Sequence, residues 1–554
     1  MSLEKGTEKK NTFHTKDLKV VSRERARELD RISEERYSIP TILLMENAGR
    51  AVAEECLKLA EKTESRNFLV VAGSGNNGGD GFCAAKHIKN LGYTVKIALV
   101  QDEEKIKGDA LQNFLIAKKM GIPIFRISSN EELEELLKQS DIVIDSIFGT
   151  GLSREIEDEF IVSVIKLMNL WRWGNEEGKT KYTENKQVKK RKIVSVDIPS
   201  GLDSNTGIPK NISVRADITV TFAPAKVGLF IGEFDRAGEV KIHDIGIPLE
   251  LWENSEIELI RDIRGILRKR ETLSHKGDFG HLLCVAGGVG RAGAAILAGK
   301  SALRVGAGLV TMMVPEPVYQ IVASASREYM VFPAPADKRS FSEKSIELFE
   351  ELVEGKTAVL VGPGIWNFDG VKKLLLHIID TIRKKKIPAV FDADALNILA
   401  EASPQRLNGT RAVITPHPGE AARMLGAKNA KEIQKDRIKH AVELSKMTGA
   451  ICVLKGARTI ITDGNRIYVN MSGGVELATG GTGDVLCGII GGFLSQGYSV
   501  TDSAVAGTFI HGVAGKLAKR DNFPLSLADQ VCEKIQDAIS AIINLYSPKT
   551  TKQR

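Results

Sequence analysis

The sequence contains few cysteines, and their spacing suggests neither a zinc site nor a disulfide framework. Only 6 of its 554 residues are cysteines; they lie far apart and form no CxxC pair, which argues against both possibilities. No apolar run approaches the ~18 residues needed to span a bilayer. The first 16 residues also lack the apolar segment of a secretory signal. We therefore expect a cytoplasmic protein with no membrane partner.

Charge is likewise too localised to indicate a nucleic-acid partner. The formal net charge is +7, but residues 179–192 alone hold seven Lys or Arg and one Glu, so the rest of the chain is nearly neutral. A nucleic-acid-binding protein usually carries a distributed basic face with interleaved aromatic residues, and no such pattern is present. We interpret the basic stretch as a solvated loop rather than a polyanion site.

The length exceeds what one hydrophobic core supports, so we expect at least two domains. In both halves, short β-like runs alternate with helical stretches, which predicts an α/β fold with mostly parallel sheets. We place the domains at residues 1–256 and 257–554, with a charged, non-periodic insertion at about 171–192. The expected strands of the two halves are 66–72, 95–100, 141–147 and 193–196, then 281–286, 309–314, 358–361, 389–391, 412–415 and 451–454.

Three loops in the first half follow predicted strands, where parallel sheets bind ligands. The glycine-rich segment 73–81 (GSGNNGGDG) precedes a helix expected from about Phe82, and its backbone N–H groups suit an anion. It is not GxGxxG, because Asn77 takes the fourth place, so an NAD-dependent oxidoreductase is disfavoured. The loops 145–152 and 196–203 each add a carboxylate beside this glycine-rich segment. Such oxygens suit a hard cation or acid/base chemistry, although Asp197 and Asp203 could also be structural caps.

In this order, NNGGDG, DSIFGTG and VDIPSGLD resemble the NAD(P)H-hydrate epimerase family of the YjeF N-terminal type, over roughly residues 18–250. The segment 44–49 (LMENAG) also looks like that family's N-terminal helix signature. The resemblance implies a Rossmann-like three-layer sandwich, with Asp197 as the acid/base candidate. It implies a potassium ion held by Asn77, Asp145 and Ser200. The implied substrate-binding residues are Asn76, Asn77, Gly78, Gly79, Asp80, Gly149, Thr150, Gly151, Leu152, Ser153, Arg154, Glu155 and Asp197.

The second half carries a sharper motif, ATGGTGDVLCG at 478–488. A Gly-Gly-Thr-Gly run before a helix directs N–H groups and the positive helix end at one point, which suits a transferred phosphoryl group. Asp484 then lies in the first turn, where it can accept a proton from a substrate hydroxyl. The segments 392–397 (DADALN), 415–420 (TPHPGE) and 455–459 (KGART) follow three other predicted strands. Lys455 and His417 taken singly could be a surface charge and a structural loop histidine, but together the loops predict one site.

With HKG at 275–277, AGG at 286–288, VGAGLV at 305–310 and GPG at 362–364, these motifs resemble the ribokinase-like superfamily and, within it, the NAD(P)H-hydrate dehydratase family, over about residues 260–545. The resemblance implies dehydration of the S epimer of hydrated NADH or NADPH, driven by ADP or ATP with Mg²⁺, and Asp484 as catalytic. The implied dehydratase substrate-binding residues are Ala294, Gly364, His417, Pro418, Gly419, Glu420, Ala421, Ala422, Arg423 and Asp484. The implied nucleotide-binding residues are Lys455, Gly456, Ala457, Arg458, Thr459, Gly474, Thr479, Gly480, Gly481, Thr482 and Gly483.

Two positions depart from the family pattern. Arg291 stands in the loop 287–294, which has no Tyr, and Glu476 precedes the anion-binding run, where it could face solvent or tune ADP against ATP. Fusion of the two halves predicts repair of both epimers of NADHX and NADPHX, and the resemblance suggests a homo-oligomer. Two alternatives stay open: a small-molecule kinase with an accessory domain, and a first half that is a non-enzymatic interaction module.

Overall fold

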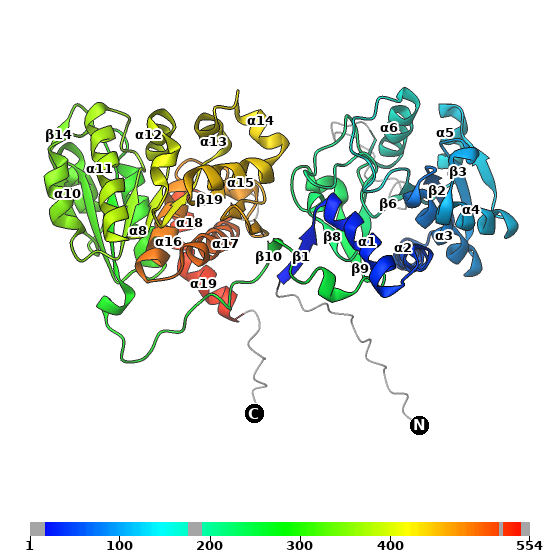
Figure 1. Ribbon diagram of the computed structural model, residues 1–554, viewed down its shortest axis with the longest axis horizontal. Coiled ribbons are helices and arrows are strands. Elements are labelled where there is room, and N and C mark those ends of the chain that lie inside the picture. Colours follow the sequence, from blue (N-terminus) through cyan, green and yellow to red (C-terminus); the bar gives the residue numbers. More distant parts are fainter. Residues whose placement is uncertain (1–16, 175–190, 520–524, 545–554) are drawn as a thin grey trace. The chain divides into compact units, whose positions relative to one another are not determined.

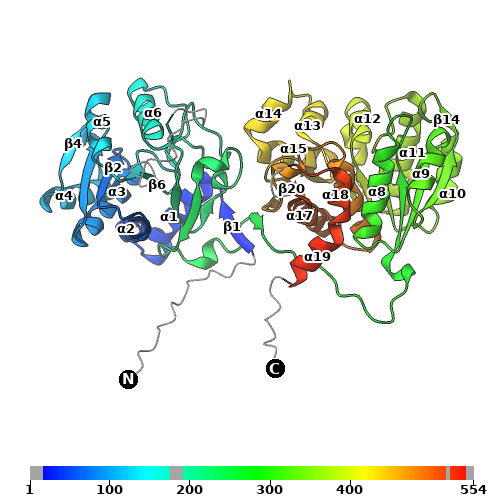
Figure 2. The ribbon, with the colours of Figure 1, turned by 180° about the vertical axis from the view of Figure 1, so that it is seen from behind.

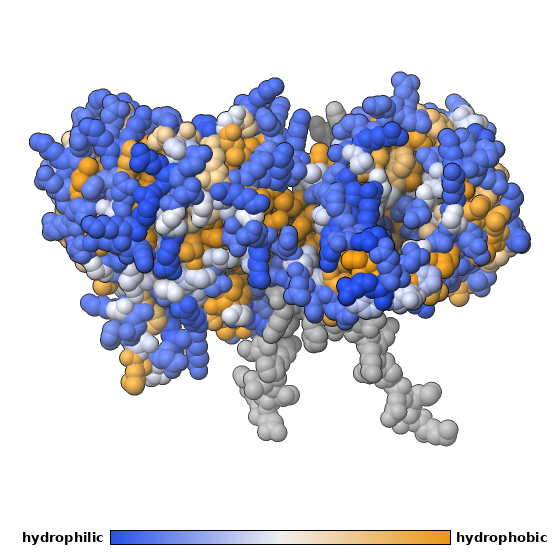
Figure 3. Space-filling view, in the orientation of Figure 1, coloured by the Kyte–Doolittle hydropathy of each residue, from blue (hydrophilic) through white to orange (hydrophobic). Residues whose placement is uncertain are grey.

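The computed structural model describes residues 17–174, 191–519 and 525–544 (Figure 1). The polar N-terminus and most of the predicted insertion and basic stretch lie outside the described residues. The chain divides into two compact units, one formed by residues 19–255 and one built from residue 256 onward. No helix in the described ranges is long and apolar enough to cross a membrane. On the face shown in Figure 3, hydrophilic side chains predominate and hydrophobic ones form separate patches.

The first unit is built on a seven-stranded sheet in which all neighbouring strands run parallel. The strand order places β2, β5 and β6 side by side in the middle, so the three predicted loops leave adjacent strands at the same edge. In order across the sheet, the strands are β4 (Ile124–Arg126), β3 (Thr94–Leu99), β2 (Asn67–Ala72), β5 (Ile142–Ser146), β6 (Lys192–Val196), β7 (Ile218–Phe222) and β9 (Glu239–His243).

Helices cover both faces of this sheet, which confirms the expected three-layer sandwich. Side chains alternate along β2: Phe68 and Val70 join the core under α2, α3 and α4, whereas Leu69 and Val71 join the core under α5 and α6. Figure 1 shows the same separation of helices. The helices are α1 (Arg23–Tyr37), α2 (Thr41–Thr63), α3 (Asn76–Asn90), α4 (Gly108–Lys119), α5 (Asn130–Lys138) and α6 (Glu159–Trp173).

The helices α1 and α3 begin in different ways. Ser22 caps α1, because its side chain accepts a hydrogen bond from the backbone N–H of Arg25. The expectation that a helix starts near Phe82 is wrong, since α3 already begins at Asn76. The NNGGDG motif is therefore the first turns of the helix and not a loop before it.

The second unit contains a larger sheet. Its strands run parallel from β13 to β19, and an antiparallel stretch then follows through β20 and β21. The order is β13 (Met330–Ala334), β12 (Leu309–Pro315), β11 (His281–Val285), β16 (Ala358–Val361), β17 (Ala389–Phe391), β18 (Ala412–Ile414), β19 (Ile451–Leu454), β20 (Ile460–Thr462), β21 (Ile467–Asn470) and β10 (Ile257–Ile260).

One face of this sheet packs on an apolar group of helices that includes α8 (Ala292–Arg304), α16 (Thr482–Ser495), α17 (Val500–Ala518), α18 (Ala528–Glu533) and α19 (Ile535–Asn544). Figure 2 shows α8, α18 and α19 side by side. The helices α11 (Asp369–Lys385), α12 (Asp394–Ala402), α13 (Pro418–Leu425) and α15 (Arg437–Thr448) follow or precede the central strands. The predicted α/β alternation is confirmed.

Candidate active sites

The first unit holds a cavity of about 840 Å³ at the carboxyl ends of β2, β5 and β6. Of the predicted epimerase substrate residues, most line it: Asn76, Asn77, Asp80, Gly149, Thr150, Gly151, Leu152, Ser153, Arg154, Glu155 and Asp197. Gly78 and Gly79 do not. A Cβ atom on Gly78 would lie 2.1 Å from the carbonyl oxygen of Gly73, and one on Gly79 would lie 2.7 Å from the sulfur of Met45. These two glycines let the start of α3 pack closely.

A lysine and three carboxylates meet in this cavity. Asp197, which follows β6, accepts hydrogen bonds from Lys226 Nζ at 2.5 Å and from Thr221 Oγ1 at 3.1 Å, and both members of the ion pair are buried. Lys226 lies on β8 (Ala225–Lys226). Asp80 and Asp30 line the same cavity. The arrangement can hold a proton on one group and accept one on another, as acid/base chemistry requires.

The environment sets the protonation of these carboxyls. Asp30 opens onto the cavity, yet the surrounding protein raises its pKa to about 6 by desolvation; the Lys226 charge opposes this shift and the Asp197 charge adds to it. Burial and the charge of Asp197 raise the pKa of Asp80 well above its usual value. The motif analysis missed Asp30 and Lys226, because both lie outside the three glycine loops.

The three predicted potassium ligands lie around one buried carboxylate. Asp145 accepts hydrogen bonds from Ser195 Oγ at 2.7 Å and from the backbone N–H and the hydroxyl of Ser200 at 2.8 and 2.5 Å. Burial raises the pKa of Asp145 although these bonds act in the opposite direction. Ser200 also accepts from the backbone N–H of Phe148. The side-chain amide of Asn77 lies next to Gly149, and both of its polar atoms are buried without a hydrogen-bond partner.

That unsatisfied amide is the observation that fits a bound cation. A buried polar group without a partner is costly, and an ion that accepts the Asn77 oxygen as a ligand would remove that cost. Asp203, by contrast, accepts hydrogen bonds from the backbone N–H groups of Asn205 and Thr206 and pairs with Arg23 at 2.5 Å. These contacts support a structural role for Asp203.

In the second unit, the predicted loops leave adjacent parallel strands at one edge. Asp392 follows β17, His417 follows β18 and Lys455 follows β19. Lys455 Nζ lies 2.8 Å from Asp392 Oδ1 and 3.9 Å from Glu420 Oε2. The HKG segment, by contrast, precedes β11 as the 3₁₀ turn η5 (Lys276–Phe279), at the opposite edge of the sheet. There the backbone of Lys276 packs against Gly308, where an added Cβ atom would lie 1.8 Å from the Lys276 carbonyl oxygen.

The Gly-Thr-Gly-Asp start of α16 lies over this ion pair. A Cβ atom on Gly483 would lie 3.3 Å from Lys455 Nζ and 3.7 Å from Asp392 Oδ2. Burial and then the charge of Asp392 raise the pKa of Asp484 to about 7, although Lys455 opposes the shift. Burial also raises the pKa of Glu420, against the opposing charge of Lys455. A carboxyl that titrates near neutrality is suited to accept a proton from a substrate hydroxyl.

His417 has a structural task as well as a place at the site. It caps α13: its Nδ1 accepts hydrogen bonds from the backbone N–H groups of Gly419 and Glu420, and its backbone N–H donates to Glu420 Oε2. Burial and the charges of Lys455 and Arg423 lower the pKa of His417. Arg423 donates to Asn397. The segment 417–423 is therefore the first turns of α13, fixed against α12.

The predicted nucleotide loops are held by a residue that no motif indicated. Arg437 is buried beneath the KGART loop and donates to the carbonyl oxygens of Leu454, Ala457 and Arg458. Arg458 in turn donates to the carbonyl of Met471, which joins this loop to the chain before Gly474. Sequence alone offered little signal for Arg437, because it is one cation among many on a helix.

Around the anion-binding turn, Thr482 Oγ1 donates to the carbonyls of Leu477 and Thr479, and this closes the loop 477–482. Glu476 is buried, and one of its carboxylate oxygens has no hydrogen-bond partner. The alternative that Glu476 faces solvent is therefore wrong: the chain turns its side chain back toward Gly474.

Ala294 and Gly364, predicted dehydratase substrate residues, lie beside each other, since a Cβ on Gly364 would lie 3.3 Å from that of Ala294. The unexpected Arg291 is next to both. It pairs with Asp394 at 2.7 Å, and its guanidinium lies 3.7 Å from the centre of the Trp366 ring. Asp394 also accepts from the backbone N–H of Trp366. Arg291 therefore ties this loop to the DADALN loop.

Comparison with known proteins gives matches in both units. A family profile described as NAD(P)H-hydrate dehydratase matches residues 282–537, and one described as YjeF-related protein N-terminus matches residues 41–228. The bifunctional NAD(P)H-hydrate repair enzyme Nnr of Moorella thermoacetica is 36% identical over 507 residues, which cover 89% of this chain and 91% of that protein. The enzyme of the same description from Thermofilum pendens is 34% identical over 547 residues, covering 97% and 96%.

A crystal structure of the ADP/ATP-dependent NAD(P)H-hydrate dehydratase from Bacillus subtilis, co-crystallised with ATP/Mg²⁺, is 28% identical with a TM-score of 0.45, and the match covers 50% of this chain and 96% of that one. The two relatives from Moorella and Thermofilum exceed 30% identity over nearly their whole length. This chain belongs to the family of bifunctional NAD(P)H-hydrate repair enzymes.

Proposed function

We propose that the chain interconverts the R and S epimers of NADHX and NADPHX in its first unit and dehydrates the S epimer in its second unit, at the expense of ADP or ATP. The observation that carries the proposal is the presence of two separate clusters, each combining a lysine with carboxyls of raised pKa at the carboxyl ends of a parallel sheet. Membership of the family supports the pairing of these two activities.

In the first unit we assign the acid/base work to the Asp197–Lys226 pair together with Asp30. The substrate carries a hydroxyl on the carbon next to the ring nitrogen, and its epimerisation needs a proton donor and an acceptor. Asp30, with a pKa of about 6, can exchange a proton near neutrality. The ion pair with Lys226 holds the Asp197 carboxylate in place at the cavity. The start of α3, from Asn76 to Asp80, would bind the phosphates or the hydrated ring.

We also propose that Asn77, Asp145 and Ser200 hold a potassium ion in this unit. The unsatisfied amide of Asn77 and the fully buried Asp145 supply hard oxygen atoms of the kind such a cation prefers. When bound, the ion would supply a positive charge for the anionic part of the substrate. The chain's own contribution is to fix the loop 148–155, because Ser200 bonds to Phe148.

In the second unit we propose that Asp484 removes the proton from the ring hydroxyl of the S epimer. The hydroxyl oxygen then attacks the terminal phosphoryl group, whose bond to the departing nucleotide breaks. The N–H groups at the start of α16 and the ammonium of Lys455 stabilise the charge that develops. The phosphate group then leaves the ring carbon with the bonding electrons, a proton leaves the adjacent carbon, and the dihydropyridine is restored.

Nucleotide binding falls to Lys455–Thr459, Gly474 and Thr479–Gly483, and Mg²⁺ would accompany the polyphosphate, since this ion is usually held through substrate phosphates. The hydrated cofactor would contact Ala294, Gly364 and the segment 417–423. Cytoplasmic location, absence of a nucleic-acid or membrane partner, and a homo-oligomer remain predictions.

Recovery of absorbance at 340 nm tests the proposal, with mixed R- and S-NADHX, Mg²⁺, K⁺ and either ADP or ATP. Full recovery of NADH is expected with at least one nucleotide, and the comparison identifies the phosphoryl donor. Recovery that stops at the S fraction would make the first unit a binding module. A stable phosphorylated product without release of phosphate would identify a small-molecule kinase instead.

A further inference from the structure

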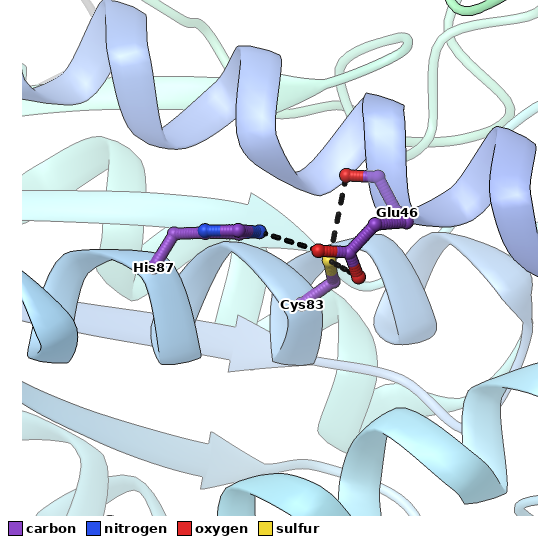
Figure 4. A group of neighbouring side chains, drawn as sticks. All are labelled: Glu46, Cys83 and His87. Carbon is purple, nitrogen blue, oxygen red and sulfur yellow. Dashed lines mark hydrogen bonds and ion pairs between the residues drawn. The ribbon is translucent and has the colours of Figure 1, made fainter.

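Three potential metal ligands meet between α2 and α3, as Figure 4 shows. Cys83 and His87 are four residues apart, so they lie on the same face of α3. Glu46 reaches them from α2. His87 Nε2 lies 2.8 Å from Glu46 Oε1, and Cys83 Sγ lies 3.3 Å from Glu46 Oε2. One ligand atom from each residue falls within 4.8 Å of the others.

This cluster is separate from the cavity described above. None of the three residues lines that cavity, whereas Asp80, one turn earlier on α3, does. The proposed potassium ligands are oxygen donors, but the cluster combines sulfur, nitrogen and oxygen. Among the residues that the structure describes, no other group of His, Cys, Asp and Glu side chains comes together in this way.

We propose that Glu46, Cys83 and His87 form a binding site for a borderline-soft divalent cation such as Zn²⁺, with its fourth position open to water. Thiolate, imidazole and carboxylate are the ligand types that Zn²⁺ takes in proteins. Partial exposure of the Glu46 and His87 side chains, 40% and 26%, leaves a route for the ion and for the water. The ion would join α2 to the helix whose first turn carries the NNGGDG motif.

The observed distances are close to those that such an ion requires. Tetrahedral bond lengths of about 2.0 Å to N and O and 2.3 Å to S place ligand atoms about 3.3 to 3.6 Å apart. The sulfur of Cys83 lies 3.3 Å from Oε2, the second oxygen of the same carboxylate, and one ligand atom from each of the three residues lies within 4.8 Å of the others. The nitrogen–oxygen distance of 2.8 Å, now a hydrogen bond, must open by about half an ångström. Rotation of the Glu46 carboxylate supplies that movement.

One neighbour competes with the ion. The ammonium of Lys86 donates to Glu46 Oε2 and, at 3.2 Å, to Asn113 Oδ1. It therefore shares the carboxylate, leaving the oxygen that faces His87 for the ion. The Cys83 thiol must lose its proton when the metal–sulfur bond forms, so one proton is released for each ion bound. Because like charges repel, replacing Lys86 by a neutral side chain should strengthen binding.

The test is a titration of the metal-free full-length protein with Co²⁺, followed by back-titration with Zn²⁺. We expect one equivalent of Co²⁺ to produce a sulfur-to-metal charge-transfer band and visible bands of four-coordinate cobalt, all removed by Zn²⁺. Cys83→Ser should abolish the charge-transfer band, and His87→Gln should weaken binding at least tenfold. Lys86→Met should tighten binding several-fold.

Cys56→Ser is the matched control, because Cys56 is also buried in the first unit but belongs to no ligand group of this kind in the described chain. It should bind Co²⁺ like the parent protein. The proposal is overturned if the parent shows no thiolate band, or if the band survives in Cys83→Ser. The result does not depend on either enzymatic activity, so failure here and failure of the proposed function can be told apart.

Discussion

Replacing Lys226 by Met tests the acid/base assignment of the first unit, because it removes the cation that Asp197 contacts. At 2.5 Å, two unit charges attract by about 7 kcal/mol at an effective dielectric constant of 20, which is an upper limit on the pair. Removing one partner of a buried pair usually costs about 3–5 kcal/mol, since the remaining charge is left uncompensated. We expect a loss of that size in the free energy of unfolding of the first unit at pH 8.

The loss should depend on pH in a definite direction. Lys226 lowers the pKa of Asp30, which is already raised to about 6, so its removal raises that pKa further. A carboxyl whose pKa is higher in the folded than in the unfolded protein favours folding when the pH is below its pKa in the unfolded protein. This stabilisation is lost as the pH rises through its pKa in the folded protein. The deficit of Lys226→Met should therefore be smallest at about pH 5 and grow toward pH 8.

Urea unfolding followed by tryptophan fluorescence measures this loss, because three of the four tryptophans, Trp171, Trp173 and Trp252, lie in the first unit. Epimerisation of R-NADHX should also fall by roughly 10²- to 10⁴-fold, while dehydration of purified S-NADHX stays unchanged. Lys210→Met is the matched control. Lys210 pairs with Asp203 at 3.3 Å, but Arg23 still compensates that carboxylate, so a loss below about 1 kcal/mol is expected. A Lys226→Met protein with parental stability and epimerisation would refute the reasoning.

Three further outcomes are expected. Asp484→Asn should lower the rate of dehydration by roughly 10²- to 10⁴-fold without affecting epimerisation. The parent's dehydration rate should rise as the pH increases through about 7, since Asp484 must lose its proton. A rate profile that is flat from pH 6 to 8 would contradict this role. Asn77→Ala should remove the difference between epimerisation rates in potassium and tetramethylammonium chloride, and an undiminished potassium effect would exclude Asn77 as a ligand. Ala393→Gly should raise the melting temperature, because Ala393 has φ 53° and ψ −119°, a conformation that glycine adopts with less strain. The gain measured by thermal unfolding should correspond to about 1 kcal/mol. A lower melting temperature would contradict the prediction.

The sequence predicts the sheets and the edge where each site forms. Short buried runs end in glycine loops or carboxylates, and parallel strands bring such ends to one edge. For this reason Asp145 and Asp197 lie at the ends of neighbouring strands, and Asp392 and Lys455 come within 2.8 Å of each other. The predicted start of α3 near Phe82 is too late in the sequence, because glycines lower helix propensity, whereas NNGGDG already forms the beginning of the helix.

Residues that act through packing could not be predicted in the same way. Asp30 lies on α1 and Lys226 on the short strand β8, so only the tertiary fold brings them to Asp197. Arg437 looks like an ordinary helical cation until its three carbonyl partners are known. The burial of Glu476 is equally a consequence of the loop that covers it.

Several of the same strand ends also carry backbone conformations that are rare for non-glycine residues. Of the nine non-glycine residues with positive φ in the described chain, Asp197, Trp366, Ala393 and Arg458 lie in loops that follow a strand of one of the two sites, whereas Ser38, Glu64 and Lys386 end helices. Such conformations cost about 1–3 kcal/mol each and persist only where the surrounding structure fixes them. Here hydrogen bonds supply that constraint: Asp197 is held by Lys226, and the backbone of Trp366 is held by Asp394. Strain and charge therefore coincide at the same strand ends, as expected if those ends are shaped for a ligand more than for stability.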